Sequence, residues 1–237
     1  MISLSAAAVI FVSAATFATA QTGGKDAVRQ GGAGRPVNAS LRLNPIVAEF
    51  DLLAEGADEI FQLALNGKME RVPKKFEALK KSTSSFPSVT DDSGTLLLPR
   101  LNRTMADLEL AVNAKDRLDT MRYANRLTLI AATVQVPYKP PTPTEVLVLD
   151  YNARELEIWS ELRRSEKLSN IVIRMHLAWQ TLMPKLLDHN ASRELKRFSE
   201  LMGRLEVAKV PEEYAKVSRQ ILVELAAIRQ VFTRPAK

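Results

Sequence analysis

Apolar residues recur along the chain at steps of three and four. In the first such segment, residues 44–66, they are Ile46, Phe50, Leu53, Ala57, Ile60, Phe61 and Ala64. This spacing places them on one face of an α-helix. Asn44 and Pro45 are typical of a helix start, and Gly67 is typical of the residue just after a helix end. The pattern therefore predicts a helix over residues 44–66.

Similar apolar stripes fill most of the remaining chain. A helix is expected to begin near Pro99, Asn190 to cap another, and Pro211 to open the last one. Thr142 and Glu145 fit a capping box at a further helix start. Sustained two-residue alternation, the pattern of half-buried strands, is absent from the sequence. We therefore predict an all-α protein.

Residues 137–143 hold four prolines in seven positions. Proline disrupts a helix interior, so this segment is expected to be an extended, proline-rich spacer. It divides the helical sequence into an N-terminal part, residues 44–136, and a C-terminal part, residues 144–235.

Two short matches suggest an internal repeat. Residues 63–68 match residues 110–115 at an offset of 47, and residues 72–76 match residues 210–214 at an offset of 138. We interpret the chain as four helix–turn–helix units, at about 44–84, 97–136, 143–187 and 190–233. One such unit cannot bury its own apolar stripe. We therefore expect repeated antiparallel helical hairpins that form one long or two tandem four-helix bundles.

The N-terminus has the pattern of a secretory signal. Residues 2–20 are uncharged and apolar, and they end in Ala18, Thr19 and Ala20, which is the small-residue pattern of signal peptidase sites. The usual basic residues before the apolar run are missing, and a retained membrane anchor is the alternative. We predict a signal peptide at 1–20 and a mature protein that is periplasmic or secreted, and not an integral membrane protein.

Residues 21–43 hold five of the nine glycines and few apolar residues, so we expect a flexible leader. The leader carries four basic residues and one acidic residue, which is half of the net charge of +6. The predicted helical part is therefore nearly balanced in charge. This dispersion of charge, together with the expected export, argues against nucleic acid as a partner.

The residue content excludes several kinds of site. A chain without cysteine has no disulfide, no thiolate metal site and no cysteine nucleophile, and two histidines cannot form a three-histidine zinc site. Phosphate-loop, GxSxG and Glu-x-x-His motifs are absent from the sequence. Carboxylate pairs could support acid–base catalysis or a two-metal centre, and Glu155 and Glu161, which flank Trp159, are candidates. Asp150 and Arg154, one helical turn apart, are better interpreted as an ordinary helix salt bridge. We expect no resident cofactor and no enzymatic activity.

One constellation has ligand chemistry. Met175, His176 and Met183 lie close together in a predicted helix of an exported bundle, where histidine and methionine can bind haem or copper. The favoured interpretation is structural, with Met175 filling the core and His176 at its boundary.

Two functional hypotheses follow. The first is a non-enzymatic interaction or scaffold protein that binds an envelope protein partner. The second is a small-ligand carrier that holds haem, copper or an apolar molecule inside a bundle.

Overall fold

The computed structural model describes residues 45–84, 86, 92–138 and 140–233. Every described residue belongs to one compact unit, Leu41–Lys237. The predicted signal peptide, the predicted leader and the cap residue Asn44 lie outside the described residues, so they stay predictions.

The described part of the chain is almost entirely helical and contains no strand. Its α-helices are α1 (Pro45–Leu65), α2 (Val72–Thr83), α3 (Asp92–Asn113), α4 (Arg117–Gln135), α5 (Thr144–Glu161), α6 (Ser165–Asp188), α7 (Ser192–Val207) and α8 (Pro211–Thr233). Two 3₁₀ turns, η1 (Met69–Arg71) and η2 (Val136–Tyr138), precede α2 and follow α4. The predicted all-α helical-bundle class is confirmed. Of these helices, none is both long and apolar enough to cross a membrane.

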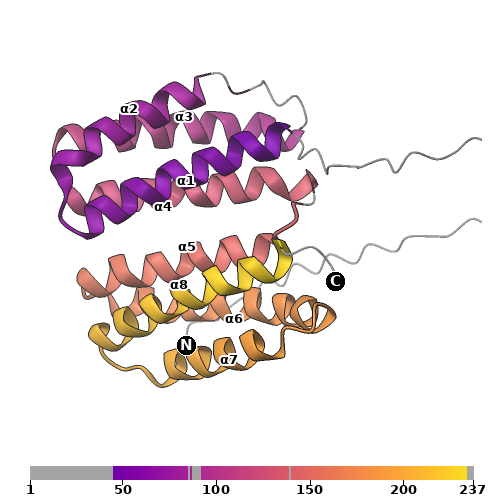
Figure 1. Ribbon diagram of the computed structural model, residues 1–237. Coiled ribbons are helices and arrows are strands. Elements are labelled where there is room, and N and C mark those ends of the chain that lie inside the picture. Colours follow the sequence, from indigo (N-terminus) through magenta and orange to yellow (C-terminus); the bar gives the residue numbers. More distant parts are fainter. Residues whose placement is uncertain (1–44, 85, 87–91, 139, 234–237) are drawn as a thin grey trace, which may run out of the picture. The chain divides into compact units, whose positions relative to one another are not determined.

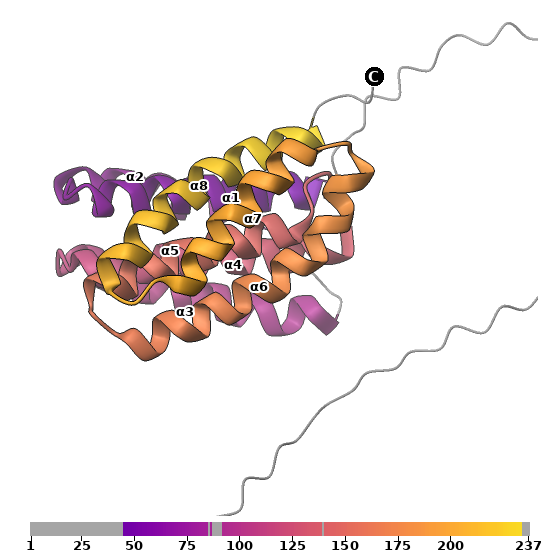
Figure 2. The ribbon, with the colours of Figure 1, turned by 90° about the horizontal axis from the view of Figure 1, so that it is seen from below.

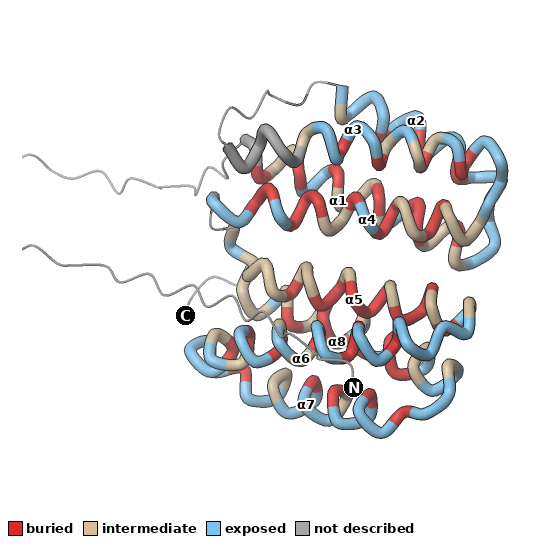
Figure 3. Tube along the Cα trace, turned by 180° about the vertical axis from the view of Figure 1, so that it is seen from behind, coloured by how far each residue is buried: buried red, intermediate tan, exposed pale blue. Residues whose placement is uncertain are grey.

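The helices lie in two groups, α1–α4 and α5–α8 (Figure 1), and each group buries its own set of apolar side chains. Buried residues are red in Figure 3. Helices α1–α4 supply nearly all of the first core, which includes Phe50 and Leu127, and α5–α8 supply the second, which includes Trp179 and Phe198. Helix α4 packs against α1 and α3, and α5 packs against α6 and α8. Helices α4 and α5 also contact each other and so join the two groups. Figure 2 shows α1 and α8 on one side of this central pair, and α3 and α6 on the other.

Two helix starts differ from the prediction. Helix α3 begins at Asp92, before Pro99, whose ring is exposed inside the helix. A proline on the exposed face removes one backbone hydrogen bond but no core contact, so the helix continues through it. Helix α7 is preceded by Ala191, and Asn190 instead takes the left-handed conformation that ends α6, with φ 55°. Asparagine tolerates that conformation better than most residues do.

The proline-rich segment also differs in detail. Pro143 precedes α5 without any side-chain cap, so the predicted capping box of Thr142 and Glu145 is wrong. Both carboxylate oxygens of Glu145 instead accept hydrogen bonds from Lys185 Nζ at 2.8 Å. The start of the segment, Pro137 included, is a 3₁₀ turn and not extended chain, because the fixed φ of proline also suits a 3₁₀ turn.

The turns after α1, α3 and α5 share one geometry. Gly67, Lys115 and Arg163 have φ values of 70°, 53° and 53°, and each lies 48 positions after the one before. In each turn the next N–H bonds to the carbonyl five residues earlier, at 2.8 to 3.0 Å, which is a Schellman motif. The sequence match at an offset of 47 aligns Gly67 with Ala114. The structural equivalent of Gly67 is Lys115, so the match is wrong by one residue at this turn. The turn before α8 is built differently, and a four-unit repeat stays a prediction.

Candidate functional site

Helix α5 carries a row of buried charged side chains. Asp150, Arg154 and Glu157 follow one another at steps of four and three, so they lie on one face of the helix. They are only 4 to 6% exposed. Charged groups are rarely buried to this extent unless they are paired. The predicted salt bridge between Asp150 and Arg154 is confirmed, but it is buried and not on the surface.

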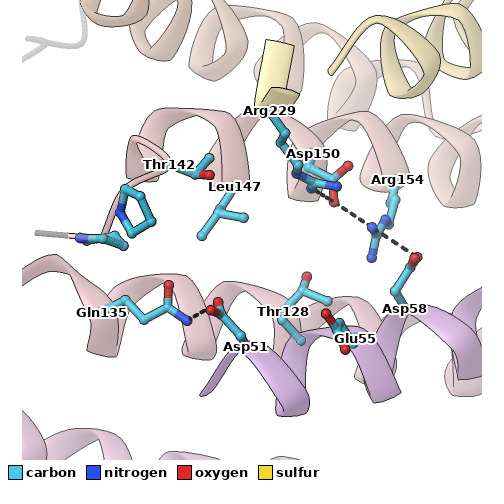
Figure 4. Close-up of a pocket in the computed structure, with 13 residues that line it drawn as sticks. Asp51, Glu55, Asp58, Thr128, Gln135, Thr142, Leu147, Asp150, Arg154 and Arg229 are labelled. Atoms are coloured by element: carbon cyan, nitrogen blue, oxygen red, sulfur yellow. Dashed lines mark hydrogen bonds and ion pairs between the residues drawn. The ribbon is translucent and has the colours of Figure 1, made fainter. Parts of the chain in front are cut away.

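The guanidinium of Arg154 links α5 to α1. Arg154 Nη2 lies 2.5 Å from Asp150 Oδ2 and 3.0 Å from Asp58 Oδ1 on α1 (Figure 4). Arg229 on α8 adds a contact of 3.1 Å between its Nη2 and Asp150 Oδ2. Two arginines and two aspartates from three helices therefore form one ionic network whose charges cancel.

A cavity of about 220 Å³ lies beside this network. Helices α1, α4, α5 and α8 and the segment before α5 line it, and it is open to solvent (Figure 4). The charged part of its wall is Asp51, Glu55, Asp58, Asp150, Arg154 and Arg229, and the apolar part is Ala54, Pro140, Pro141 and Leu147. Apolar walls with a few convergent polar groups are the usual form of a small-molecule site.

Two of the residues that line the cavity, Arg154 and Glu55, have polar atoms without a partner among the described residues. Arg154 Nε and Nη1 are buried and have no hydrogen-bond partner among the described residues. The ring of Phe61, whose centroid is 5.4 Å from Arg154 Cζ, supplies only a cation–π contact. Asp51 accepts a hydrogen bond from Gln135 Nε2 at 2.9 Å. Glu55 has neither a hydrogen bond nor an ion pair within the described part of the chain.

Glu157 lies outside the cavity wall and belongs to a separate ion pair. Its Oε1 lies 3.0 Å from Nε of Arg219 on α8, and its Oε2 is buried with no partner in the described part. Burial raises the pKa of the Glu157 carboxyl, and the hydrogen bond and charge of Arg219 act against that rise. This pair connects α5 to α8, within the second group of helices.

The predicted carboxylates Glu155 and Glu161 connect α5 to α4. Glu155 accepts hydrogen bonds from Trp159 Nε1 at 2.8 Å and from Asn125 Nδ2 of α4 at 3.1 Å. Glu161 forms an ion pair with Arg117 of α4. Each carboxylate is therefore engaged by its own partners, and the two do not form one acidic site.

Tyr151 lies on the same side of α5 as Glu155. Burial and the charge of Glu155 raise the pKa of its phenol to about 12. The positive charges of Arg126, Arg174 and Arg100 act in the opposite direction. The neutral phenol is therefore the stable form in the folded protein over the physiological pH range.

The structure directs Met175 and His176 to different surroundings. Met175 is buried in the second core, and Met183 is half-buried against the same core. His176 Nε2 lies 2.5 Å from Glu206 Oε1 on α7. The described residues contain no group of three or more His, Cys, Asp or Glu that is suited to a metal ion. A metal site at Met175, His176 and Met183 stays a hypothesis.

Sequence reasoning did not find the cavity. Asp51, Glu55 and Asp58 form a visible acidic row, at steps of four and three along α1. Such a row is ordinarily a solvated helix face. Nothing in the local pattern shows that it faces Arg154, because that contact depends on how α1 and α5 pack.

The comparisons with known proteins identify no relative: no family model matches the chain, and neither does any curated protein or solved structure.

Proposed function

We propose that this is an exported, non-enzymatic helical protein that binds a partner protein in the cell envelope. The observation that carries the proposal is an apolar stripe on the outer face of α6. Export is supported by the signal-like pattern of residues 1–20.

The stripe consists of Ile173, Leu177, Pro184 and Leu187. Ile173, Leu177 and Leu187 are 58%, 62% and 57% exposed, and Pro184 is exposed as well. Their spacing places all four on one face of the helix. At a rise of about 1.5 Å per residue, the stripe is roughly 21 Å long. An apolar row of this length on a solvent-facing helix is typical of an interaction surface.

The chemistry of the stripe favours a helical partner. Ser169 and Gln180 lie on the same face, so it carries no charge from residue 169 to residue 187. Exposed apolar side chains at helical spacing form a ridge that fits the groove of a second amphipathic helix. We therefore expect the partner to present apolar residues at steps of three and four.

Export is tested with the full chain and an Ala20→Arg variant. A large charged residue at the last signal position blocks cleavage by signal peptidase. We expect the parent chain to be recovered outside the cytoplasm with Gln21 as its first residue, and the variant to keep residues 1–20. Recovery of the parent chain in the cytoplasm with an uncleaved N-terminus would contradict the proposal.

Partner binding is tested by photocrosslinking in intact cells. A photoreactive amino acid is placed at Leu177 or, as the matched control, at Val223 of α8, which is 74% exposed and outside the stripe. We expect a discrete adduct from position 177 only, and its crosslinked peptide should have apolar residues at helical spacing. The same adducts from both positions, or none from position 177, would overturn the proposal.

A further inference from the structure

A surface hollow between α5 and α6 adjoins the apolar stripe. Helix α5 supplies Glu155 and Trp159 to its wall, and α6 supplies Lys167, Ile173 and Arg174 among others. Ile173 belongs both to this wall and to the stripe, so the two surfaces are continuous. A partner helix that lies along the stripe therefore has one of its flanks over the hollow.

Positive side chains of α6 border this hollow. Lys167 and Arg174 are exposed and lie seven positions apart, on the flank of α6 that faces α5. Lys167 Nζ lies 6.0 Å from the centroid of the Trp159 ring, and Arg174 Nε donates a hydrogen bond to Asn152 Oδ1 at 3.1 Å. Neither cation forms an ion pair with a carboxylate among the described residues.

The positive surface continues across α5 to α4 and α3. Arg126 of α4 and Arg100 of α3 are exposed, and they too have no carboxylate partner in the described part of the chain. Their charges, like that of Arg174, act to lower the pKa of the Tyr151 phenol, so all three arginines lie near it. Figure 2 shows α3 and α6 on the same side of α4 and α5. Folding thus gathers cations that are far apart in the sequence.

Two carboxylates lie among these cations, and both have partners. Glu155 accepts hydrogen bonds from Trp159 Nε1 and Asn125 Nδ2. Asp119 accepts one from Arg122 Nη1 at 2.6 Å. The surface therefore keeps an excess of positive charge, and a negatively charged partner would be attracted to it.

The neighbouring stripe decides which kind of anionic partner fits best. An anionic polysaccharide would use the cations but would leave Ile173 and Leu177 exposed to water. An acidic amphipathic helix covers both surfaces, because its apolar face packs on the stripe while a row of carboxylates along one flank reaches the cations.

We propose that the partner helix carries acidic residues along one flank, and that these pair with Lys167 and Arg174 while its apolar face lies on the stripe. A longer acidic segment extends the contact to Arg126 and Arg100. The inference rests on the proposed function and specifies which helices can bind. Basic helices are excluded, because like charges would meet at the hollow.

The experiment uses a synthetic peptide with the sequence of the segment that crosslinks to position 177. Its affinity is measured by isothermal titration calorimetry for the chain as it is recovered from cells. One variant combines Lys167→Gln with Arg174→Gln. The matched control combines Arg193→Gln with Lys196→Gln, which removes the same charges from exposed positions on α7.

We expect the first variant to bind the peptide about tenfold more weakly, the equivalent of two ion pairs at the rim of an interface. The control should bind it as the parent does, and circular dichroism checks that both variants are folded. High salt should weaken binding to the parent more than binding to the first variant, since salt screens only the charges that remain.

Three results would overturn the inference. The first is a crosslinked segment without Asp or Glu beside its apolar residues. The second is equal peptide affinity of the two variants. The third is that the first variant loses binding to phosphatidylglycerol vesicles but keeps binding to the peptide, which would make the surface a membrane contact. Failure of the proposed function is recognised separately, because the parent chain then gives no adduct from position 177, and this inference falls with it.

Discussion

The two apolar cores and the junction between them are held together by different interactions. Each core is built from aliphatic and aromatic side chains of four consecutive helices, with Ile158 of α5 added to the first. The junction, meaning the contact of α1 and α4 with α5, combines the apolar contact of Ile158 with a set of polar pairs. These pairs are Asp58–Arg154, Arg117–Glu161 and Asn125–Glu155. Apolar burial stabilises each core with its full transfer free energy, whereas an ion pair must first offset the desolvation of its charges.

This difference implies that the junction is the weaker part of the described fold. Interfaces between separately packed groups of helices are generally more polar than cores, and they separate more readily. The junction also specifies which helix faces meet, because a mispaired face would leave Arg154 or Asp150 buried without a partner.

The largest effect is expected from a core truncation. Phe198 is fully buried, and its ring centroid lies 4.5 Å from that of Trp179. Phe198→Ala should lower the free energy of unfolding by about 3–5 kcal/mol, because it removes buried area and leaves a cavity. The exposed Leu177→Ala should change it by about 0.5 kcal/mol or less. Urea unfolding measures both, and equal values would contradict the assignment of the core.

The junction is tested next, through its buried guanidinium. Arg154→Met should cost about 3 kcal/mol, because Asp150 stays buried with Arg229 as its only cation among the described residues. Asp58 is 42% exposed, so Asp58→Asn should cost about 1 kcal/mol or less. Urea unfolding of the two variants compares these costs. If Arg154→Met cost no more than Asp58→Asn, the network would not be buried as described.

The pH dependence at Tyr151 is expected to be smaller. Its pKa is about 12 in the folded protein, and about 10 in the unfolded chain. Between pH 10 and pH 12 the unfolded chain loses this proton and the folded protein keeps it. Stability should therefore fall by about 2–3 kcal/mol as the pH rises through that window.

Lysine side chains also lose protons between pH 10 and pH 12, but they do so equally in the parent protein and in Tyr151→Phe. The difference between the two proteins therefore isolates the contribution of the Tyr151 phenol. Urea unfolding at pH 10 and at pH 12 should show a smaller loss of stability in the variant. Equal losses in the parent and the variant would show that the phenol of Tyr151 is not shifted.

The smallest effects are expected at the turns. Gly67 has φ 70°, and an added Cβ would meet nothing within 4 Å, so Gly67→Ala should cost about 1 kcal/mol through backbone strain alone. Lys115→Gly should have the opposite sign, because it relieves the same strain at φ 53°. Thermal unfolding of both variants checks the signs, and a stabilising Gly67→Ala would contradict the turn geometry.

The sequence predicted features that depend on neighbouring residues and missed those that depend on packing. Helix α1 and the pair Asp150–Arg154 follow from spacings of three and four, which local geometry determines. Asp58 and Arg154 are 96 positions apart, and only the packing of α1 near α5 brings them together. A glycine such as Gly67 indicates a position where φ can be positive, because it has no side chain. Lysine carries no such signal, so the left-handed conformation of Lys115 was not predicted.

The most direct test of the central claim is urea unfolding of the chain from Gln21 with single tryptophans. Trp159 packs at the edge of the second core, and its ring centroid lies 5.7 Å from Arg122 Cζ of α4, so its fluorescence also responds to separation of the junction. Trp179 reports on the second core. Fluorescence and far-ultraviolet circular dichroism are recorded on the same samples of Trp179→Phe and Trp159→Phe. We predict that Trp159 fluorescence changes at lower urea than the helical signal, and that Trp179 fluorescence changes together with it. Coincident transitions of all signals in both variants would contradict a junction weaker than the cores.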